Sequence, residues 1–246
     1  MGSVNSVRRA SGPEPTSELM TPTLPAAAKK RPRNAVASRE RILKFATKEF
    51  AARGYDGARI DAIVARCKIS KNLIYHYFDG KEALFIEVME QAYGAMRERQ
   101  NELALTGEDP VADMRQLVMK TVQHFIDQPD FLHLLSNENL HKATHIRKSK
   151  QIQAMFNPLR IALAEVLQKG KDKGVFRLDA DWVDLYVSIS GLGSYFITNR
   201  YTLSFVLDVD LGTPARVAGR LAHAADMVLS YLCNTQPGTP GSGASA

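Results

Sequence analysis

Cysteine is scarce in this chain, and its scarcity limits the kinds of protein that the chain can be. Among the 246 residues there are two cysteines, Cys67 and Cys233, which lie far apart in the sequence. Such a pair does not make a disulfide scaffold, and it shows no metal-ligand spacing. We therefore expect a protein of the reducing cytoplasm that folds without disulfides.

Long apolar runs are also missing. The longest, residues 185–197, is too short to cross a bilayer and is typical of a buried helix. The N-terminal part is interrupted by Pro13, Pro15 and Pro22, and it contains no apolar core of the length found in signal peptides. The sequence therefore predicts neither a membrane-spanning helix nor a secretion signal.

Motifs of catalysis and metal binding are absent or incomplete. There is no Gly-x-Ser-x-Gly, no His-Glu-x-x-His and no glycine-rich phosphate loop after a strand. Glu138 and His141 have the Glu-x-x-His spacing of di-iron bundles, and His145 follows four residues later. A di-iron site needs a second such pair and two more carboxylates. We therefore expect no enzymatic activity, no cofactor and no metal site.

Positive charge is concentrated in one segment. Residues 29–81 contain 14 Lys and Arg against 5 Asp and Glu, a net charge of +9, whereas residues 82–246 carry a net charge of −3. This distribution indicates a small basic module on a mildly acidic body, and it favours a nucleic acid or another anionic surface as partner. A basic face that is merely solvated is the alternative.

The patterns between the two ends of the chain are those of an all-α protein. Residues 1–36 are rich in Pro, Ser, Thr and Ala and predict a disordered tail, and residues 234–246 predict a second flexible tail. No segment shows a convincing strand alternation. Caps and apolar spacing predict about nine helices, with boundaries near 38–54, 60–65, 71–78, 81 onward, 110–126, 130 onward, 143–169 with a kink at Pro158, 179–203 and 214–232.

Residues 60–78 contain the pattern that carries most information about function. A short helix, a tight turn at Cys67-Lys68-Ile69 and a second short helix follow one another, and Ser70 stands at the N-cap of the second helix. Apolar residues such as Ile63 and Ile74 predict the packed side. The second helix begins with small polar residues and has aromatic residues on its outer side, as a helix that reads base edges in the major groove requires.

The segment 38–85 resembles the DNA-binding domain of TetR-family transcriptional regulators. The resemblance rests on Ile42 and Phe50, on Gly54-Tyr55, on the run Ile69-Ser-Lys-Asn-Leu-Ile-Tyr-His-Tyr-Phe78 and on Lys81-Glu-Ala-Leu84. It covers about a fifth of the chain. It implies a three-helix helix-turn-helix domain at 37–84 and a helical ligand-binding and dimerisation domain at 85–233.

The resemblance also implies roles for individual residues. Lys71, Asn72 and Leu73 correspond to base contacts, since Asn pairs with adenine and Leu covers a thymine methyl group. The N-terminus of the helix that begins at Lys81 offers N–H groups to a phosphate. The complete set of expected DNA contacts is Arg59, Lys68, Ser70, Lys71, Asn72, Leu73, Tyr75, His76, Tyr77 and Lys81.

Two residues depart from the family pattern. Cys67-Lys68 replaces the usual Ala-Gly, so a positive φ in the turn would cost about 1 kcal/mol. Asp61 replaces a polar or basic residue and would repel DNA if exposed. The basic cluster of the tail, Lys29 to Arg33, offers a minor-groove arm, or else is a solvated linker.

The remaining helices are expected to hold a dimer face and a ligand pocket. The small residues of 188–194 and the apolar side of the last helix, with Val217, Leu221, Ala224, Ala225, Val228 and Leu229, are compatible with the four-helix dimer interface that the resemblance implies, and ordinary packing within one chain is the alternative. Polar and aromatic groups within apolar helices predict a cavity for an unknown small-molecule effector. Its candidate lining residues are His124, His133, Asn137, Phe156, Trp182, Tyr186, Tyr195, Phe196 and Asn199.

Together with these features, the resemblance implies a homodimeric regulator that a small molecule releases from a palindromic operator, and we expect a repressor because most members of the family repress. The two reading helices would then lie about 34–36 Å apart. The alternative is a non-specific architectural DNA-binding protein or a membrane-surface protein that uses the basic tail as an anchor. A steep salt dependence without sequence preference would indicate the former, and liposome binding the latter.

Overall fold

The computed structural model describes residues 2, 31–101 and 105–234. The expected tails at 1–30 and 235–246 lie outside the described residues. Every regular element in the described part of the chain is a helix, which confirms the all-α prediction. None of these helices is both long and apolar enough to cross a membrane.

Helix α1 (Arg31–Gly57) begins earlier than the sequence predicted, so residues 31–36 are helical and Ser38 is not its N-cap. Proline is tolerated in the first turn of a helix, and Ala35 and Ala37 are strong helix formers, so nothing stops the helix at Ser38. Gly54 interrupts α1 with φ 67° and ψ 177°. A Cβ atom at Gly54 would also overlap the side chain of Asn137, so the position requires glycine for two reasons.

Helices α2 (Ile60–Cys67) and α3 (Lys71–Phe78) pack on α1 around buried side chains that include Phe50, Ile63 and Ile74. The same core continues into α4 (Lys81–Asn101) and reaches Leu134 of α6. The domain boundary expected at residue 84 therefore falls inside α4. Since α4 belongs to both packing units, it connects the basic module rigidly to the rest of the protein.

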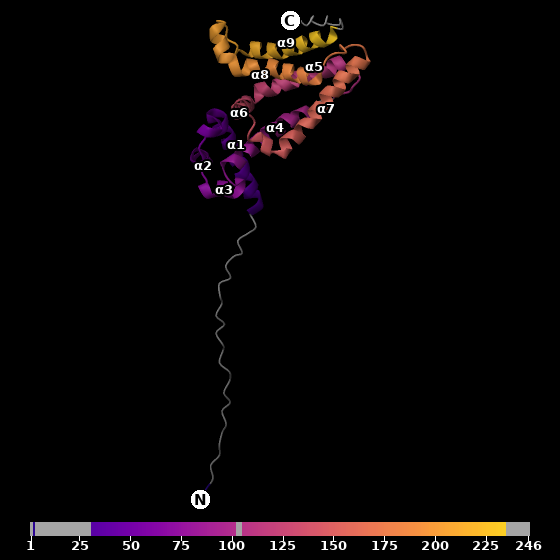
Figure 1. Cartoon of the computed structure of the whole chain (residues 1–246). Coiled ribbons are helices and arrows are strands. Elements are labelled where there is room, and N and C mark those ends of the chain that lie inside the picture. Colours follow the sequence, from indigo (N-terminus) through magenta and orange to yellow (C-terminus); the bar gives the residue numbers. More distant parts are fainter. Residues whose placement is uncertain (1, 3–30, 102–104, 235–246) are drawn as a thin grey trace, which may run out of the picture.

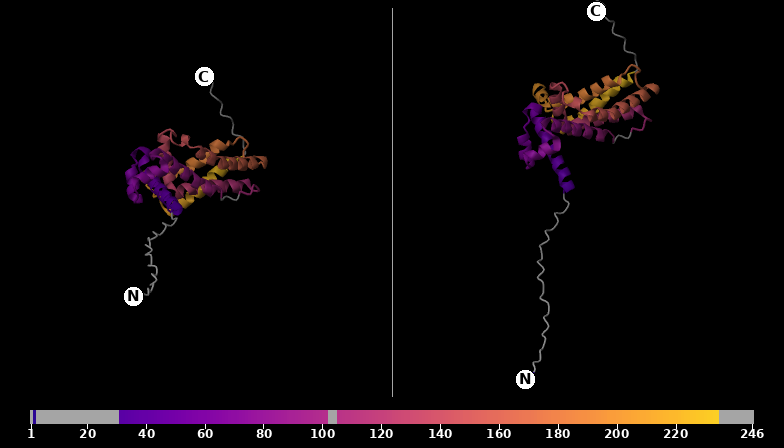
Figure 2. Two further views of the ribbon diagram at one scale, coloured as in Figure 1. Left: turned by 90° about the horizontal axis from the view of Figure 1, so that it is seen from below. Right: turned by 60° about the horizontal axis from the view of Figure 1, so that its bottom comes forward.

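The body consists of α5 (Pro110–Asp127), α6 (Pro129–Leu140), the short 3-10 helix η1 (Ile146–Lys148), α7 (Lys150–Asp172), α8 (Trp182–Val206) and α9 (Pro214–Cys233). Helices α2 and α3 lie at one end of the molecule and α8 and α9 at the other, with α4 and α7 between them (Figure 1). A rotated view shows the same separation (Figure 2, right).

Side-chain caps fix several helix starts. The Asp109 carboxylate accepts the N–H groups of Val111 and Ala112, both at 3.0 Å, as predicted. The start of α8 differs from the prediction, because Asp179 pairs with Arg177 and the cap is provided by Asp181.

The helix predicted at 143–169 begins instead at Lys150, where the Ser149 hydroxyl caps it. Residues 141–149 form turns and η1, and Lys142 and Ala143 both have positive φ. Pro158 neither splits nor ends α7. Pro158 and Ala154 are both exposed, so the Ala154 carbonyl that loses its partner remains open to solvent.

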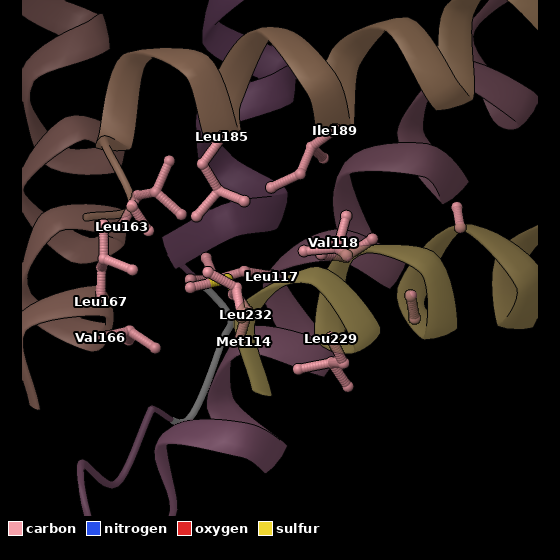
Figure 3. Packing of buried hydrophobic residues seen from close by; sticks show 14 of the residues in the cluster. Met114, Leu117, Val118, Leu163, Val166, Leu167, Leu185, Ile189, Leu229 and Leu232 are labelled. Carbon is pink, nitrogen blue, oxygen red and sulfur yellow. The ribbon is translucent and has the colours of Figure 1, made fainter. Parts of the chain in front are cut away.

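The largest core cluster joins α5, α7, α8 and α9. Leu185 and Ile189 of α8 point toward Leu117 and Val118 of α5, with Leu229 and Leu232 of α9 close by (Figure 3). Four residues expected at a dimer interface are buried here within one chain, namely Ala224, Ala225, Val228 and Leu229.

Gly193, in the small-residue run that was also assigned to the dimer interface, lies against Phe125 and Val122 of α5. Those four residues of α9 and Gly193 therefore pack within the protomer, whereas Val217 and Leu221 are only partly buried. The reason is that an apolar stripe does not reveal which of two partners, its own chain or a second copy, it packs against.

Candidate nucleic-acid interface and effector cavities

The turn between α2 and α3 contains a residue with positive φ, although lysine replaces the glycine of the family pattern there. Lys68 adopts a left-handed conformation with φ 52° and ψ 50°. Its N–H group and that of Ile69 lie 3.4 and 3.5 Å from the carbonyl oxygens of Ala65 and Val64. The turn therefore keeps its shape with a lysine in place of glycine, at a cost of about 1 kcal/mol, and it presents an exposed ammonium beside α3.

Helix α3 divides its side chains between core and surface as the sequence predicts. Ile74 and Phe78 are buried, while Leu73 and Tyr77 are half-buried. The polar and aromatic side chains that face solvent are Lys71, Asn72, Tyr75 and His76. Because α3 is at the end of the molecule opposite α8 and α9, these groups are free to enter a groove of DNA (Figure 1).

Ser70 occupies the N-cap position of α3 with extended backbone angles, but its hydroxyl makes no capping hydrogen bond to the helix. The position was predicted correctly, whereas the capping interaction was not. An exposed hydroxyl at the N-terminal end of α3 retains its donor and acceptor for a base edge or a phosphate.

Asp61 of α2 and Lys71 of α3 form an ion pair, with 2.8 Å between Oδ1 and Nζ. The hydrogen bond to Asp61 and the charge of its carboxylate raise the pKa of Lys71. Asp61 is three-quarters exposed, so its negative charge does face the side of the molecule where DNA is expected. The Asp61 carboxylate is paired, however, because it forms an ion pair with Lys71, the first basic residue of α3.

Arg59 and Lys81 stand at the starts of α2 and α4, the helices that precede and follow α3. The Lys81 ammonium is 3.3 Å from the carbonyl oxygen of Asp56 and 4.9 Å from the centre of the Tyr55 ring. Arg59 is the exposed N-cap residue of α2. Both cations are anchored at helix N-termini, where N–H groups reinforce the attraction for a phosphate. The side chains of Arg31 and Arg33, from the expected minor-groove arm, are outside the described part of the structure.

Three of the expected effector residues come together in the body. Phe156 and Tyr186 meet edge to face with ring centroids 5.0 Å apart, and Phe156 and Trp182 line a pocket of about 430 Å³. The buried Arg97 guanidinium lies 5.0 Å from the centre of the Phe156 ring and also hydrogen-bonds Tyr186. The cation that lines the pocket itself is Arg160, whose guanidinium is 5.9 Å from the centre of the Trp182 ring.

Sequence analysis missed two residues of α4, namely Tyr93, which lines this pocket, and Arg97, whose guanidinium contacts the Phe156 ring. Burial raises the pKa of Tyr93 to about 12, so its hydroxyl remains protonated. Burial also lowers the pKa of Arg97. Their spacing of four residues on a helix whose other face is apolar was the signal available, because it places both on one side of α4.

The other expected effector residues are dispersed. His124 is buried beside a second, smaller pocket between α1, α4, α5 and α6. His133 is exposed, Asn137 packs against Gly54, and Phe196 with Tyr195 lines a groove between α8 and α9. The Asn199 amide donates to the Tyr195 carbonyl. The structure therefore brings Phe156 and Trp182 to one pocket, with Tyr186 in contact with Phe156, and leaves the rest elsewhere.

Comparison with known proteins identifies the family to which this chain belongs. A model of bacterial regulatory proteins of the tetR family matches residues 42–88, and a model of the tetracyclin repressor-like C-terminal domain matches residues 110–228. The HTH-type transcriptional repressor NicS of Pseudomonas putida is 35% identical over 195 residues, covering 79% of this chain and 92% of NicS. The chain belongs to the TetR family. It is a DNA-binding transcriptional regulator, and the first match contains the whole of α2 and α3.

Other proteins that are similar to this TetR-family chain are also named as transcriptional regulators. The HTH-type transcriptional repressor AcnR of Corynebacterium efficiens is 26% identical over 184 residues, covering 71% of this chain and 90% of AcnR. A solved transcriptional regulator from Streptomyces coelicolor has a TM-score of 0.62 at 26% identity, covering 79% of this chain and 98% of its own. The ketosteroid transcriptional regulator KstR2 of Mycobacterium tuberculosis shares the fold, with a TM-score of 0.62 at 19% identity, over 80% of this chain and 95% of its own.

In this TetR-family chain, polar and aromatic side chains form the junction between the helix-turn-helix unit of α1 to α3, which we call the reader, and the body. The buried Glu138 carboxylate is 2.7 Å from Nδ1 of His145 and accepts the N–H groups of His145 and Ile146. The His145 ring lies 4.1 Å from that of Tyr55, and Nε2 of His141 is 3.0 Å from Asp56. The residues considered as metal ligands thus bond to one another and to α1. In the described residues, no three His, Cys, Asp or Glu side chains gather in a potential metal site.

Proposed function

We propose that this regulator is a cytoplasmic homodimeric repressor, without a resident cofactor, that a small-molecule effector releases from a palindromic operator. The observation that carries the proposal is the exposed face of α3, with Lys71, Asn72, Tyr75 and His76 at one end of the molecule. NicS and AcnR, both named as repressors, support the direction of regulation.

Exposed apolar residues on α8 and α9 support a dimer at the opposite end. Val183, Val187, Met227 and Tyr231 all expose more than two-fifths of their surface, and a groove of about 520 Å³ runs between the two helices. Apolar side chains gathered on two adjacent helices are typical of an isologous four-helix interface. Of the α9 residues that the sequence suggested, Val217 and Leu221 are only partly buried, whereas Ala224, Ala225, Val228 and Leu229 are buried within the protomer.

The position of the aromatic cavity supports effector control. Tyr93 of α4 lines it, Arg97 of α4 contacts Phe156 in its wall, and the same helix begins with Lys81 beside the reading surface. A ligand that binds more tightly to one orientation of α4 shifts the dimer toward one distance between its two α3 helices. When that distance does not match the operator, the affinity for operator DNA falls.

Fluorescence anisotropy with duplexes from upstream of the protein's own gene tests this function. We expect a dimer by light scattering, tight binding to one duplex with two half-sites, and weaker discrimination for Asn72→Ala by about 5- to 150-fold. The double variant Tyr77→Ala, Lys81→Ala should bind specific and unrelated duplexes equally less well. Retention of full affinity and sequence preference in both variants would place the reading surface elsewhere.

A non-specific architectural protein is the second candidate, because the basic segment alone favours it. It predicts binding that depends steeply on salt and is equal for all duplexes. Sequence preference that survives unrelated competitor DNA decides against it.

A further inference from the structure

The connection between α6 and α7 carries a charge unlike that of the rest of the body. Residues 139–164 contain five Lys and Arg and no Asp or Glu, whereas the other residues of 82–246 contain 11 Lys and Arg against 19 Asp and Glu. Residues 141–150, which we call the junction loop, hold four of these five cations, namely Lys142, Arg147, Lys148 and Lys150, and all four are exposed. Positive charge gathered on an otherwise acidic body indicates an anionic partner.

The junction loop lies against the residues that hold Lys81 beside the DNA-facing surface. The Lys148 ammonium pairs with the carboxylate of Glu82, which follows Lys81 in the first turn of α4. Nε2 of His141 is 3.0 Å from Oδ2 of Asp56, and the carbonyl oxygen of Asp56 accepts a hydrogen bond from the Lys81 ammonium. The loop therefore continues the basic surface at the starts of α2 and α4.

Buried hydrogen bonds fix the conformation of the junction loop. The Glu138 carboxylate of α6 accepts the N–H groups of His145 and Ile146 at 2.8 and 3.0 Å. The Ser149 hydroxyl donates to the Glu90 carboxylate of α4. Because α4 and α6 both hold the loop, its cations are presented from a fixed backbone, and less conformational entropy is lost when they bind a partner.

The fold itself does not account for the cations of the loop. Lys142, Arg147 and Lys150 form no ion pair with a carboxylate in the part of the chain that the structure describes. Exposed cations without a partner contribute little to stability, and cations of one segment repel one another. A role in binding explains why they are gathered here.

We infer that the junction loop binds phosphates of the DNA backbone through Lys142 and Arg147, so that the DNA contact of each subunit extends from the reader and α4 onto the body. Each of these two residues is next in the chain to one that bonds beside Lys81, His141 in one case and Lys148 in the other. An arginine can also bind a phosphate with two parallel hydrogen bonds. The inference rests on the proposed function, because the DNA-facing placement of α3 and Lys81 directs the loop toward the duplex.

Anisotropy titrations of the full chain at several salt concentrations test the inference on two probes, a duplex from upstream of the gene and an unrelated duplex. In the double variant Lys142→Gln, Arg147→Gln the slope of log K against log salt should become shallower by about 1.8 or more, since each lost phosphate contact removes about 0.9. At about 50 mM salt the affinity should fall about tenfold or more for both duplexes alike. The ratio of the two affinities should stay the same, because phosphate contacts carry no sequence information.

Two controls separate a phosphate contact from a loss of charge or of stability. The double variant Lys120→Gln, Lys173→Gln removes the same charge from exposed positions on α5 and after α7, and it should keep the slope and the affinity of the wild type. Lys173 follows the end of α7, about 33 Å from the start of that helix at the junction loop. Arg147→Lys keeps the charge and should keep the slope, and all these variants should melt at the temperature of the wild type.

Phosphate-ethylation interference on the upstream duplex shows whether the contact is direct. Ethyl groups on some phosphates should weaken binding of the wild type and have no effect on the double variant of the junction loop. The inference is overturned if that variant keeps the slope of the wild type, if the control variant changes the slope equally, or if both proteins give the same interference pattern.

These results are separable from a failure of the proposed function. That failure appears as equal affinity of the wild type for the upstream and the unrelated duplex. Failure of the junction loop appears as an unchanged salt slope on the unrelated duplex, a measurement that requires no operator.

Discussion

Asp61→Asn should strengthen DNA binding, which is the opposite of what most surface substitutions near a binding site do. The Asp61 carboxylate is three-quarters exposed and lies 2.8 Å from the Lys71 ammonium at the start of α3. The substitution removes one negative charge from the DNA-facing side and frees one lysine for a phosphate. Stability should change little, because both partners of this ion pair are largely solvated.

The magnitude follows from counterion release. Each additional phosphate that a cation neutralises makes the slope of log K against log salt steeper by about 0.9. Between about 50 and 200 mM salt the variant should therefore lose about 3.5-fold more affinity than the wild type. At the low-salt end it should bind about threefold or more tightly, to specific and unrelated duplexes alike.

Anisotropy titrations at four salt concentrations measure both quantities. Asp179→Asn is the matched control, since it removes a carboxylate that pairs with Arg177 just before α8, far from α3. The control should leave slope and affinity unchanged. An unchanged slope for Asp61→Asn, or weaker binding at low salt, would refute the placement of Lys71 on the DNA-facing surface.

Three further predictions concern the junction between reader and body. Gly54→Ala should lower stability by about 1–3 kcal/mol, because of its positive φ and the overlap with Asn137, while Gly57→Ala should be near neutral in the same thermal melts. Glu138→Ala should cost about 3–5 kcal/mol in urea unfolding, and a loss below about 1 kcal/mol would contradict the buried pair. A hydrogen bond to the Asn137 carbonyl and, next in size, one to the Asp56 carboxylate raise the pKa of His141. The stabilisation of the folded state by protonated His141 is therefore fully present below about pH 6.5, and it is lost as the pH rises through the folded-state pKa. The melting-temperature deficit of His141→Ala should therefore be larger at pH 6 than at pH 9, and a constant deficit would argue against it.

The reading helix was predictable because short-range rules determine it. The apolar spacing placed Ile74 and Phe78 inside, and the remaining residues of α3 could then only face solvent or its neighbours. The cap at Asp109 was predictable for the same reason, since cap and N–H groups lie within three residues. The resemblance to the TetR family then assigned DNA-binding roles to side chains that the apolar pattern had already placed on the surface.

The junction and the cavities were not predictable, because they depend on contacts between distant residues. The break between α6 and α7 is held by Glu138, which accepts the N–H groups of His145 and Ile146. A one-dimensional pattern shows neither this bond nor the side of α9 that packs on its own protomer. Likewise, the meeting of Arg97 with Phe156 joins α4 to α7 across more than fifty residues.

Sequence-specific binding of DNA by the face of α3 is the central claim, and a competition gel shift tests it most directly. Purified protein is titrated against DNA from upstream of its own gene at two salt concentrations, with excess unrelated duplex. The account predicts a discrete complex that survives the competitor and loses its discrimination in Asn72→Ala. A complex that the competitor removes, and that weakens equally for every duplex as salt rises, would contradict it.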